Sequence, residues 1–220
     1  MSNSPLVAYT KISPNKTSPR NHVIDTITIH CVVGQLSVEK VGDIFADPAR
    51  KASSNYGIGP DGRVGLYVDE ADRSWCSSSG SNDNRAITIE CASDMTHPYA
   101  INDTVYKSLI NLLVDICKRN NIKELKWKGD KNLIGDVSQQ NMTVHRWFAA
   151  KACPGDYIYN RLGQIAAEVN EKLNGTVEAK PQTLYCVQVG AYAVKANAEN
   201  KLKELKAAGF DGFITTKIKS

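Results

Sequence analysis

The sequence lacks the features of exported, membrane-spanning and disulfide-stabilised proteins. Its first residues contain no positively charged segment followed by an apolar run, so no secretory signal peptide is expected. No apolar run approaches the roughly 20 residues that cross a bilayer, which argues against a membrane anchor. The six cysteines include no Cys-x-x-Cys pair, so we expect free thiols in a reducing cytosol rather than a disulfide framework.

A strong charge imbalance and internal repeats are also missing. The formal net charge of +4 is spread along the chain, so the sequence predicts no nucleic-acid-binding surface. Weak attraction to an anionic polymer such as a bacterial wall is compatible with this charge. The 220 residues, of which 42% are hydrophobic, are enough for one medium-sized globular domain and a small additional unit.

Hydrophobic patterns in the first 175 residues predict an α/β domain, because strand-like alternation and helical periodicity follow one another along the chain. The predicted elements are strands at 23–31 and 85–91, a hairpin of 53–59 and 64–68 around Pro60-Asp61-Gly62, and helices at 37–45, 103–119 and 158–173. Three polar segments are expected to be irregular: an extended arm at 1–22, a loop at 77–84 and a long connection over the cleft at 125–142.

The most informative stretch runs from Thr143 to Gly155, where His145 and Cys153 stand eight positions apart. A Cys-Pro-Gly sequence cannot continue a helix or a strand, so Cys153 is expected at a turn where its thiolate can point into a cleft. Imidazole and thiolate suit zinc, and a catalytic zinc needs three protein ligands and one open position. His30 can supply the third ligand, since it lies at the end of a strand, on the more polar face. If it stood alone, the favoured interpretation would be a half-exposed histidine with no functional role.

A carboxylate ends the second alternating strand. Glu90 shares a face with Thr88, and the rest of that strand consists mainly of isoleucine and threonine. Such a residue has either a functional role or the task of discouraging aggregation at an edge strand. The pattern of the strand itself leaves both interpretations open.

Taken in order, the strand ending in His30, the hairpin, Ile89-Glu90 and the His145…Cys153 motif resemble the zinc-dependent, type-2 N-acetylmuramoyl-L-alanine amidases. This group includes amidase-type phage lysozymes and peptidoglycan recognition proteins, and the resemblance spans about residues 20–173. It implies a mixed central β-sheet flanked by helices. It also implies hydrolysis of the amide bond that joins the lactyl group of N-acetylmuramic acid to L-alanine.

The resemblance further implies a role for each site residue. Zinc is expected on His30, His145 and Cys153, with water in the fourth position. Glu90 is the expected general base, and Lys151, two residues before the cysteine, is expected to stabilise the developing oxyanion.

The sequence departs from the family pattern at two positions. Ser54 stands where phage lysozymes and recognition proteins carry a catalytic tyrosine, so Tyr56 is kept as a secondary catalytic candidate. Trp75-Cys76 occupies a place where the family often has Trp-His, and Cys76 is not expected to bind the metal.

After a polar linker at 176–182, residues 183–220 resemble the first half of a SPOR domain, a module that binds the glycan strands of peptidoglycan through its sheet. A strand at 183–189, a helix at 197–208 and a strand at 213–216 are predicted, with Gln188 and Tyr192 as candidate glycan contacts. We expect two copies to pair into a homodimer that completes the sheet; the alternative is a partly ordered tail.

Three functional classes remain. The leading interpretation is a phage endolysin that is made in the cytoplasm, without a signal peptide, and acts on the cell wall after release. A second is a recognition module that binds muropeptides without cutting them, but such relatives typically lack the cysteine present at Cys153. A third is a cytosolic recycling amidase, against which the wall-binding tail argues.

Overall fold

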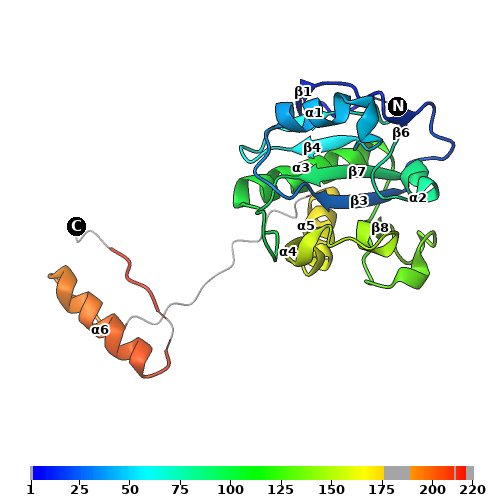
Figure 1. The fold of residues 1–220 in the computed structure, drawn as a ribbon. Helices are drawn as coiled ribbons and strands as arrows, with labels where there is room; N and C mark the ends of the chain where they lie inside the picture. The colour runs from blue at the N-terminus through cyan, green and yellow to red at the C-terminus, as the bar shows by residue number, and fades with distance from the viewer. Residues whose placement is uncertain (1, 176–188, 211, 217–220) are drawn as a thin grey trace. The chain divides into compact units, whose positions relative to one another are not determined.

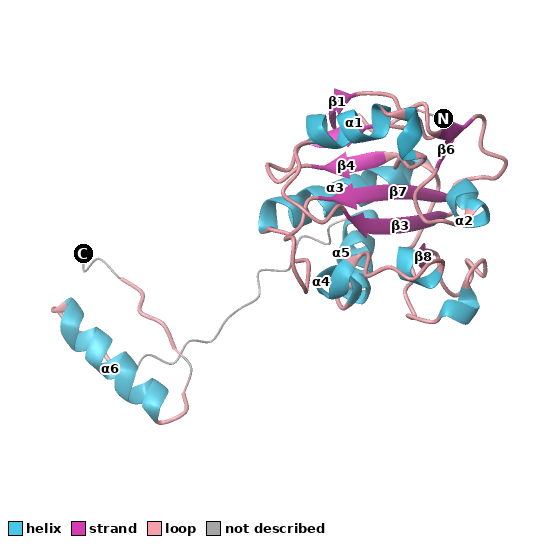
Figure 2. Cartoon of the chain, in the orientation of Figure 1, coloured by secondary structure: helices cyan, strands magenta, loops and turns pink. Residues whose placement is uncertain are grey.

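The computed structural model describes residues 2–175, 189–210 and 212–216, which belong to two compact units, 1–177 and 178–220. The first unit is built on a six-stranded sheet in the order β1-β5-β4-β7-β3-β8 (Figures 1 and 2). Its strands are β1 Val7–Thr10, β5 Val64–Leu66, β4 Tyr56–Ile58, β7 Ala86–Cys91, β3 Thr26–Cys31 and β8 Met142–Thr143. The β4–β5 hairpin is antiparallel and the other neighbours are parallel, so the sheet is mixed, as expected.

Strand parity decides which side chains enter the core. Ile27 and Ile29 of β3 are fully buried in the main hydrophobic cluster, together with residues of α3 (Asp103–Arg119) and α5 (Leu162–Leu173). Thr28 and His30 alternate with them and therefore point to the opposite face of the sheet. Figure 1 shows α3 behind the sheet, so the polar face that carries His30 is the one turned away from that helix.

The opposite face carries a smaller apolar cluster. Helix α1 (Val38–Ala46) begins after Ser37, whose hydroxyl accepts a hydrogen bond from the Lys40 amide, and packs through Val41 and Phe45 against Tyr67. The predicted helix over these residues is therefore confirmed, and helices cover both faces of the sheet.

Several segments expected to be irregular are ordered. Residues 80–85 form α2 (Gly80–Arg85) instead of a loop, because the Ser79 hydroxyl accepts the Asn82 amide and begins the helix despite its polar composition. The arm at 1–22 contributes β1 to the main sheet and pairs β2 (Lys16–Thr17) with β6 (Arg73–Ser74).

Two more segments differ from the sequence-based expectation. The 125–142 connection contains a short 3-10 helix, Lys131–Leu133, and ends in β8. The single helix expected at 158–173 is two helices, α4 (Gly155–Tyr159) and α5, separated at Asn160 and Arg161.

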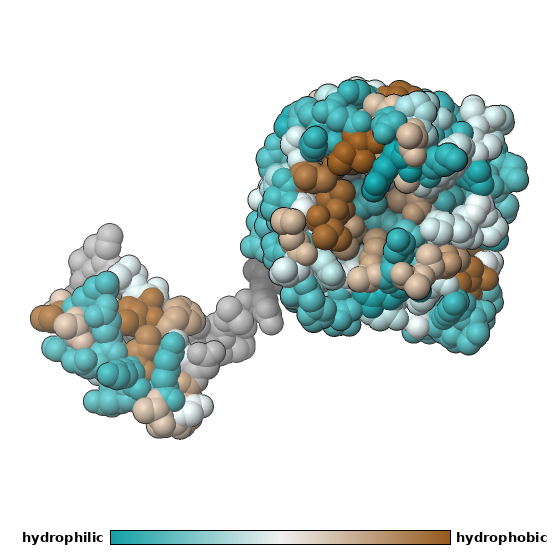
Figure 3. Space-filling view, in the orientation of Figure 1, coloured by the Kyte–Doolittle hydropathy of each residue, from teal (hydrophilic) through white to brown (hydrophobic). Residues whose placement is uncertain are grey.

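The second unit contains helix α6 (Lys195–Ala207), close to the predicted range. The strand predicted at 213–216 is not formed, since residues 212–216 have no regular structure. Most of the strand predicted at 183–189, and the linker at 176–182, lie outside the described residues. Apolar side chains gather on the visible side of this unit in Figure 3. The exposed ones are Val189, Tyr192, Val194, Phe210, Phe213 and Ile214.

Within the described ranges, no helix combines the length and apolar character that crossing a membrane requires.

Candidate active site

The three expected metal ligands meet in space although they come from distant parts of the chain. His30 is the penultimate residue of β3, His145 begins a short 3-10 helix (His145–Trp147), and Cys153 lies in the loop before α4. Their donor atoms all lie within 4.8 Å of one another. The sulfur of Cys153 is 3.3 Å from His30 Nδ1, and the centroids of the two imidazole rings are 5.2 Å apart. The residues that the sequence singled out therefore form one cluster.

The donor set fits a zinc ion. Burial, followed by the neighbouring His145, lowers the pKa of His30 to about 3, so the ring is neutral at physiological pH and can offer a lone pair to a metal. A nitrogen and a sulfur bound to one tetrahedral zinc are about 3.5 Å apart, given bond lengths of about 2.0 and 2.3 Å. The observed separation of 3.3 Å between His30 Nδ1 and the Cys153 sulfur is close to this value.

Glu90 stands next to the cluster because of the β3–β7 register, which pairs His30 directly with Glu90. Its Oε1 lies 3.9 Å from the sulfur of Cys76, and its Oε2 is buried without a hydrogen-bond partner. Burial, assisted by the nearby Cys31, raises the pKa of Glu90 to about 8. A carboxyl group with a pKa near neutrality is suited to accept and return a proton.

Lys151 is exposed on the loop between His145 and Cys153. Burial lowers the pKa of His145, and the charge of Lys151 contributes further in the same direction. The ammonium group is therefore electrostatically close to the imidazole.

Tyr56 lies outside the cluster, which corrects its selection as a secondary candidate. It pairs with Ile89 rather than with Glu90, so its side chain is on the core face of the sheet. The ring is fully buried, and its hydroxyl donates to Glu70 Oε1 at 2.6 Å and accepts the Ser4 amide at 2.9 Å. These partners give Tyr56 a structural task and no access to the ligands.

A closed ring of hydrogen bonds connects β3, α2 and β8 next to the two histidines. Asn82 Nδ2 donates to Thr28 Oγ1 at 3.0 Å, and Thr143 Oγ1 donates to Asn82 Oδ1 at 2.9 Å. The two threonine hydroxyls are 2.7 Å apart, and because the Thr143 proton goes to Asn82, Thr28 donates to Thr143. All three side chains are buried. Each threonine stands two residues before one of the histidines, so the ring holds in place the backbone that leads to His30 and to His145.

A second group of contacts fixes the cysteine loop. The Arg146 guanidinium donates to Asp156 at 2.9 Å and to the Ala152 carbonyl at 2.5 Å, and it lies over the Tyr159 ring. The Arg146 amide also donates to the carbonyl of Cys153 at 3.2 Å. These contacts connect the loop that carries Cys153 to the 3-10 helix that carries His145.

Ser78 is a contact that sequence reasoning missed. Its hydroxyl lies 3.0 Å from Nε2 of His145, which leaves Nδ1 as the nitrogen free to face a metal. Ser78 has a φ of 65°, a left-handed conformation that is uncommon for a residue with a side chain. Nothing in the serine-rich sequence around it indicates which hydroxyl would be turned toward the site.

The candidate glycan contacts of the second unit are only partly described. Tyr192 is 45% exposed, so its ring is accessible to a ligand. Gln188 lies outside the described residues. Both remain predictions.

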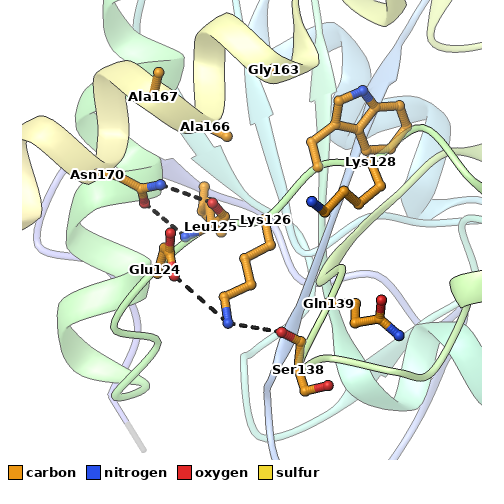
Figure 4. Close-up of a pocket in the computed structure, with 11 residues that line it drawn as sticks. Glu124, Leu125, Lys126, Lys128, Ser138, Gln139, Gly163, Ala166, Ala167 and Asn170 are labelled. Atoms are coloured by element: carbon orange, nitrogen blue, oxygen red, sulfur yellow. Dashed lines mark hydrogen bonds and ion pairs between the residues drawn. The ribbon is translucent and has the colours of Figure 1, made fainter.

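A separate hollow of the first unit contains none of the expected site residues. It lies between residues 124–128, residues 138–139 and helix α5. Figure 4 shows the Lys126 ammonium between Glu124 and Ser138, where it donates to the Ser138 carbonyl at 2.9 Å. The Lys126 ammonium group is therefore already paired within the protein.

Comparisons with known proteins identify the family of the chain. The family model for N-acetylmuramoyl-L-alanine amidase (Amidase_2) matches residues 20–156, and the model of the SPOR domain matches residues 181–220. No curated protein matches the chain.

Solved structures share the fold. An AmpD derivative superposes with a TM-score of 0.55, at 19% identity over 76% of this chain and 99% of that one. A mutant endolysin from Bacillus subtilis has a TM-score of 0.55, at 15% identity over 73% of this chain and 97% of that one. The endolysin amidase LysCS from Clostridium intestinale has a TM-score of 0.52, at 18% identity over 74% and 93%. The family model covers more than half of the sequence, and the chain therefore belongs to the N-acetylmuramoyl-L-alanine amidases, enzymes that hydrolyse peptidoglycan, with a SPOR domain at its C-terminal end.

Proposed function

We propose that the protein is a zinc-dependent amidase that cuts the bond between the lactyl group of N-acetylmuramic acid and L-alanine. His30, His145 and Cys153 are the zinc ligands. The observation that carries this assignment is the convergence of their three donor atoms within 4.8 Å, at the end of the strand paired with Glu90. When bound, zinc would polarise the amide carbonyl and acidify the attacking water.

The protein residues then have distinct tasks. Glu90 takes a proton from the attacking water onto its carboxylate and delivers it to the nitrogen of the leaving L-alanine, so the carboxylate is regenerated in each cycle. Its unpartnered Oε2 is the atom available for this transfer. Lys151 holds its positive charge near the carbonyl oxygen, where negative charge develops as the amide is attacked.

Two experiments test these roles. Purified protein is incubated with cell walls, and the release of new L-alanine amino groups is followed before and after removal of metal with a chelator. Activity is expected to disappear on chelation and to return with zinc. Glu90→Gln is expected to lose at least a hundredfold in rate while keeping one zinc per chain.

Glu171→Gln, on the exposed side of α5, is the matched control and should retain the parent rate. Near-normal turnover by Glu90→Gln would contradict the proton-transfer role, whereas activity that survives complete zinc removal would contradict the metal dependence.

The biological role that we propose is that of an endolysin, made in the cytoplasm and acting on the wall after release. The SPOR match supports this choice over a recycling amidase, because an enzyme that acts on soluble fragments has no need of a wall-binding module. A much higher rate on intact sacculi than on soluble muropeptides is expected; the reverse preference would favour recycling.

We further propose that Gln188 and Tyr192 contact glycan strands and that two copies pair through the C-terminal unit. Tyr192→Ala is expected to weaken sedimentation with purified walls while leaving the rate on soluble muropeptides unchanged. Sedimentation velocity over a range of concentrations tests the pairing, and a monomer at every concentration would contradict it.

A further inference from the structure

A second set of donor atoms also includes His30. The donor atoms of His30, Cys76 and Glu90 are all within 4.8 Å of one another, and neither Cys76 nor Glu90 belongs to the set of zinc ligands assigned above. His30 is fully buried and turns Nδ1 toward Cys153, while its Nε2 has no hydrogen-bond partner. Glu90 Oε2 is also buried without a partner. The three residues of this second set therefore carry two unpartnered buried polar atoms and a thiol.

Unpartnered buried polar atoms of this kind are costly and need a reason, such as an ion. A thiolate and a carboxylate oxygen bound to one tetrahedral zinc are about 3.6 Å apart, given bond lengths of about 2.3 and 2.1 Å. The Cys76 sulfur and Glu90 Oε1 are 3.9 Å apart. The distance between these two atoms is thus close to that expected for two ligands of one metal ion, without any change in the backbone.

The loop that carries Cys76 is held in place by the protein itself. The buried Asp83 carboxylate accepts the backbone amides of Cys76 at 3.0 Å and of Ser77 at 3.1 and 3.2 Å. This carboxylate also places a negative charge near the thiol, which favours a cation. Cys76 and Glu90 are each partly exposed as whole residues.

We propose that His30 Nε2, Cys76 and Glu90 form a second, inhibitory site for a thiophilic divalent cation such as Zn²⁺ or Cd²⁺. This proposal rests on the proposed function, because the site shares His30 with the catalytic zinc and contains Glu90, the general base. Binding displaces three protons to solvent, from the Cys76 thiol, the Glu90 carboxyl group and His30 Nε2, so this site fills after the first. The second ion occupies the carboxylate that would carry the proton, and hydrolysis stops.

Cadmium counting is the direct test. The full-length protein is equilibrated with Cd²⁺ by dialysis, bound metal is measured, and the ultraviolet charge-transfer band of cadmium–thiolate bonds is recorded. The parent protein is expected to bind two ions, with a further rise in the band as the second binds. Cys76→Ser and Glu90→Gln are each expected to bind one.

Cys117→Ala, which removes a buried thiol of α3 outside both sets, is the control and should still bind two ions. Wall hydrolysis is then measured at increasing zinc concentration, and each protein is compared with its own rate at one equivalent of zinc. The zinc concentration that halves this rate is expected to be at least tenfold higher for Cys76→Ser than for the parent protein.

The two proposals fail in different ways. A parent protein that binds one ion, cuts walls and tolerates excess zinc would overturn the second site and leave the amidase assignment intact. Two ions retained by both Cys76→Ser and Glu90→Gln would also overturn it. A protein that binds no zinc and cuts no walls would instead contradict the proposed function.

Discussion

Replacing Tyr56 by phenylalanine separates a structural role from a catalytic one. The Tyr56 hydroxyl donates to Glu70 Oε1 at 2.6 Å and accepts the Ser4 amide at 2.9 Å. Glu70 is itself 1% exposed and is held by Arg119 at 2.6 and 2.8 Å and by Asn120 at 3.0 Å. The substitution therefore removes one of several partners from a buried carboxylate and leaves a buried amide without an acceptor.

The expected cost follows from these contacts. A hydrogen bond to a charged group contributes about 1.5 to 3 kcal/mol, and an amide left unpaired in the interior costs about 1 to 3 kcal/mol. Because Glu70 keeps Arg119 and Asn120, we expect Tyr56→Phe to lose about 3 kcal/mol in the free energy of unfolding. For a domain of this size that corresponds to a fall of about 6 to 12 °C in Tm.

Circular dichroism melts and urea unfolding measure the loss, and activity is assayed on a soluble muropeptide well below the lower Tm. We expect kcat/KM to stay within twofold of the parent. Tyr106→Phe, which removes one half-buried hydroxyl that donates to Glu168 at 3.0 Å, is the control and should cost about 1 kcal/mol. A hundredfold fall in kcat/KM with an unchanged melt would refute the structural assignment and make Tyr56 catalytic.

Three further predictions concern the metal site. Ser78→Ala should weaken zinc binding about 10- to 100-fold, measured by competition with a chromophoric chelator, because His145 Nε2 loses its partner. The control Ser81→Ala should bind zinc like the parent protein. Equal zinc affinities of Ser78→Ala and the parent would show that the contact has no role. Thr143→Val should lower the free energy of unfolding, measured by urea denaturation, by about 2 to 4 kcal/mol, since Thr28 and Asn82 each lose a buried partner. A loss of less than about 0.5 kcal/mol would show that the hydrogen-bonded ring is dispensable. Lys151→Met should lower kcat with zinc content unchanged, and an unchanged kcat would remove the residue from the reaction.

Much of the site could be read from the sequence because its signals are local. His30 and Glu90 each end an alternating strand, and the Cys153-Pro154-Gly155 turn marks a thiol held outside regular structure. Thr28, two residues before His30, shares its face of the strand because alternate residues of a strand point to the same side, and β8 pairs Thr143 directly with Thr28. That signal could have identified the hydrogen-bonded ring.

The features that could not be read depend on register and on long-range contacts. Tyr56 was kept as a secondary candidate because Ser54 stands at the position of the family's tyrosine, but the β4–β7 pairing places Tyr56 opposite Ile89 and turns it into the core. Helix α2 was hidden by its serine and asparagine content, because its stability comes from the Ser79 cap and from tertiary bonds of Asn82 and Asp83. The pairing of Cys76 with Glu90 joins residues 14 positions apart and has no sequence signature.

The direct pairing of His30 with Glu90 across neighbouring strands has a consequence for protein engineering. Their spacing is set by the main-chain ladder of β3 and β7, so it does not depend on the length or composition of the segments that follow these strands. Residues 32–36 and 92–101 could accordingly be grafted from other members of the family to alter substrate preference without moving Glu90 relative to His30. Such chimaeras would offer a route to lytic enzymes with a chosen bacterial target range on an unchanged chemical core.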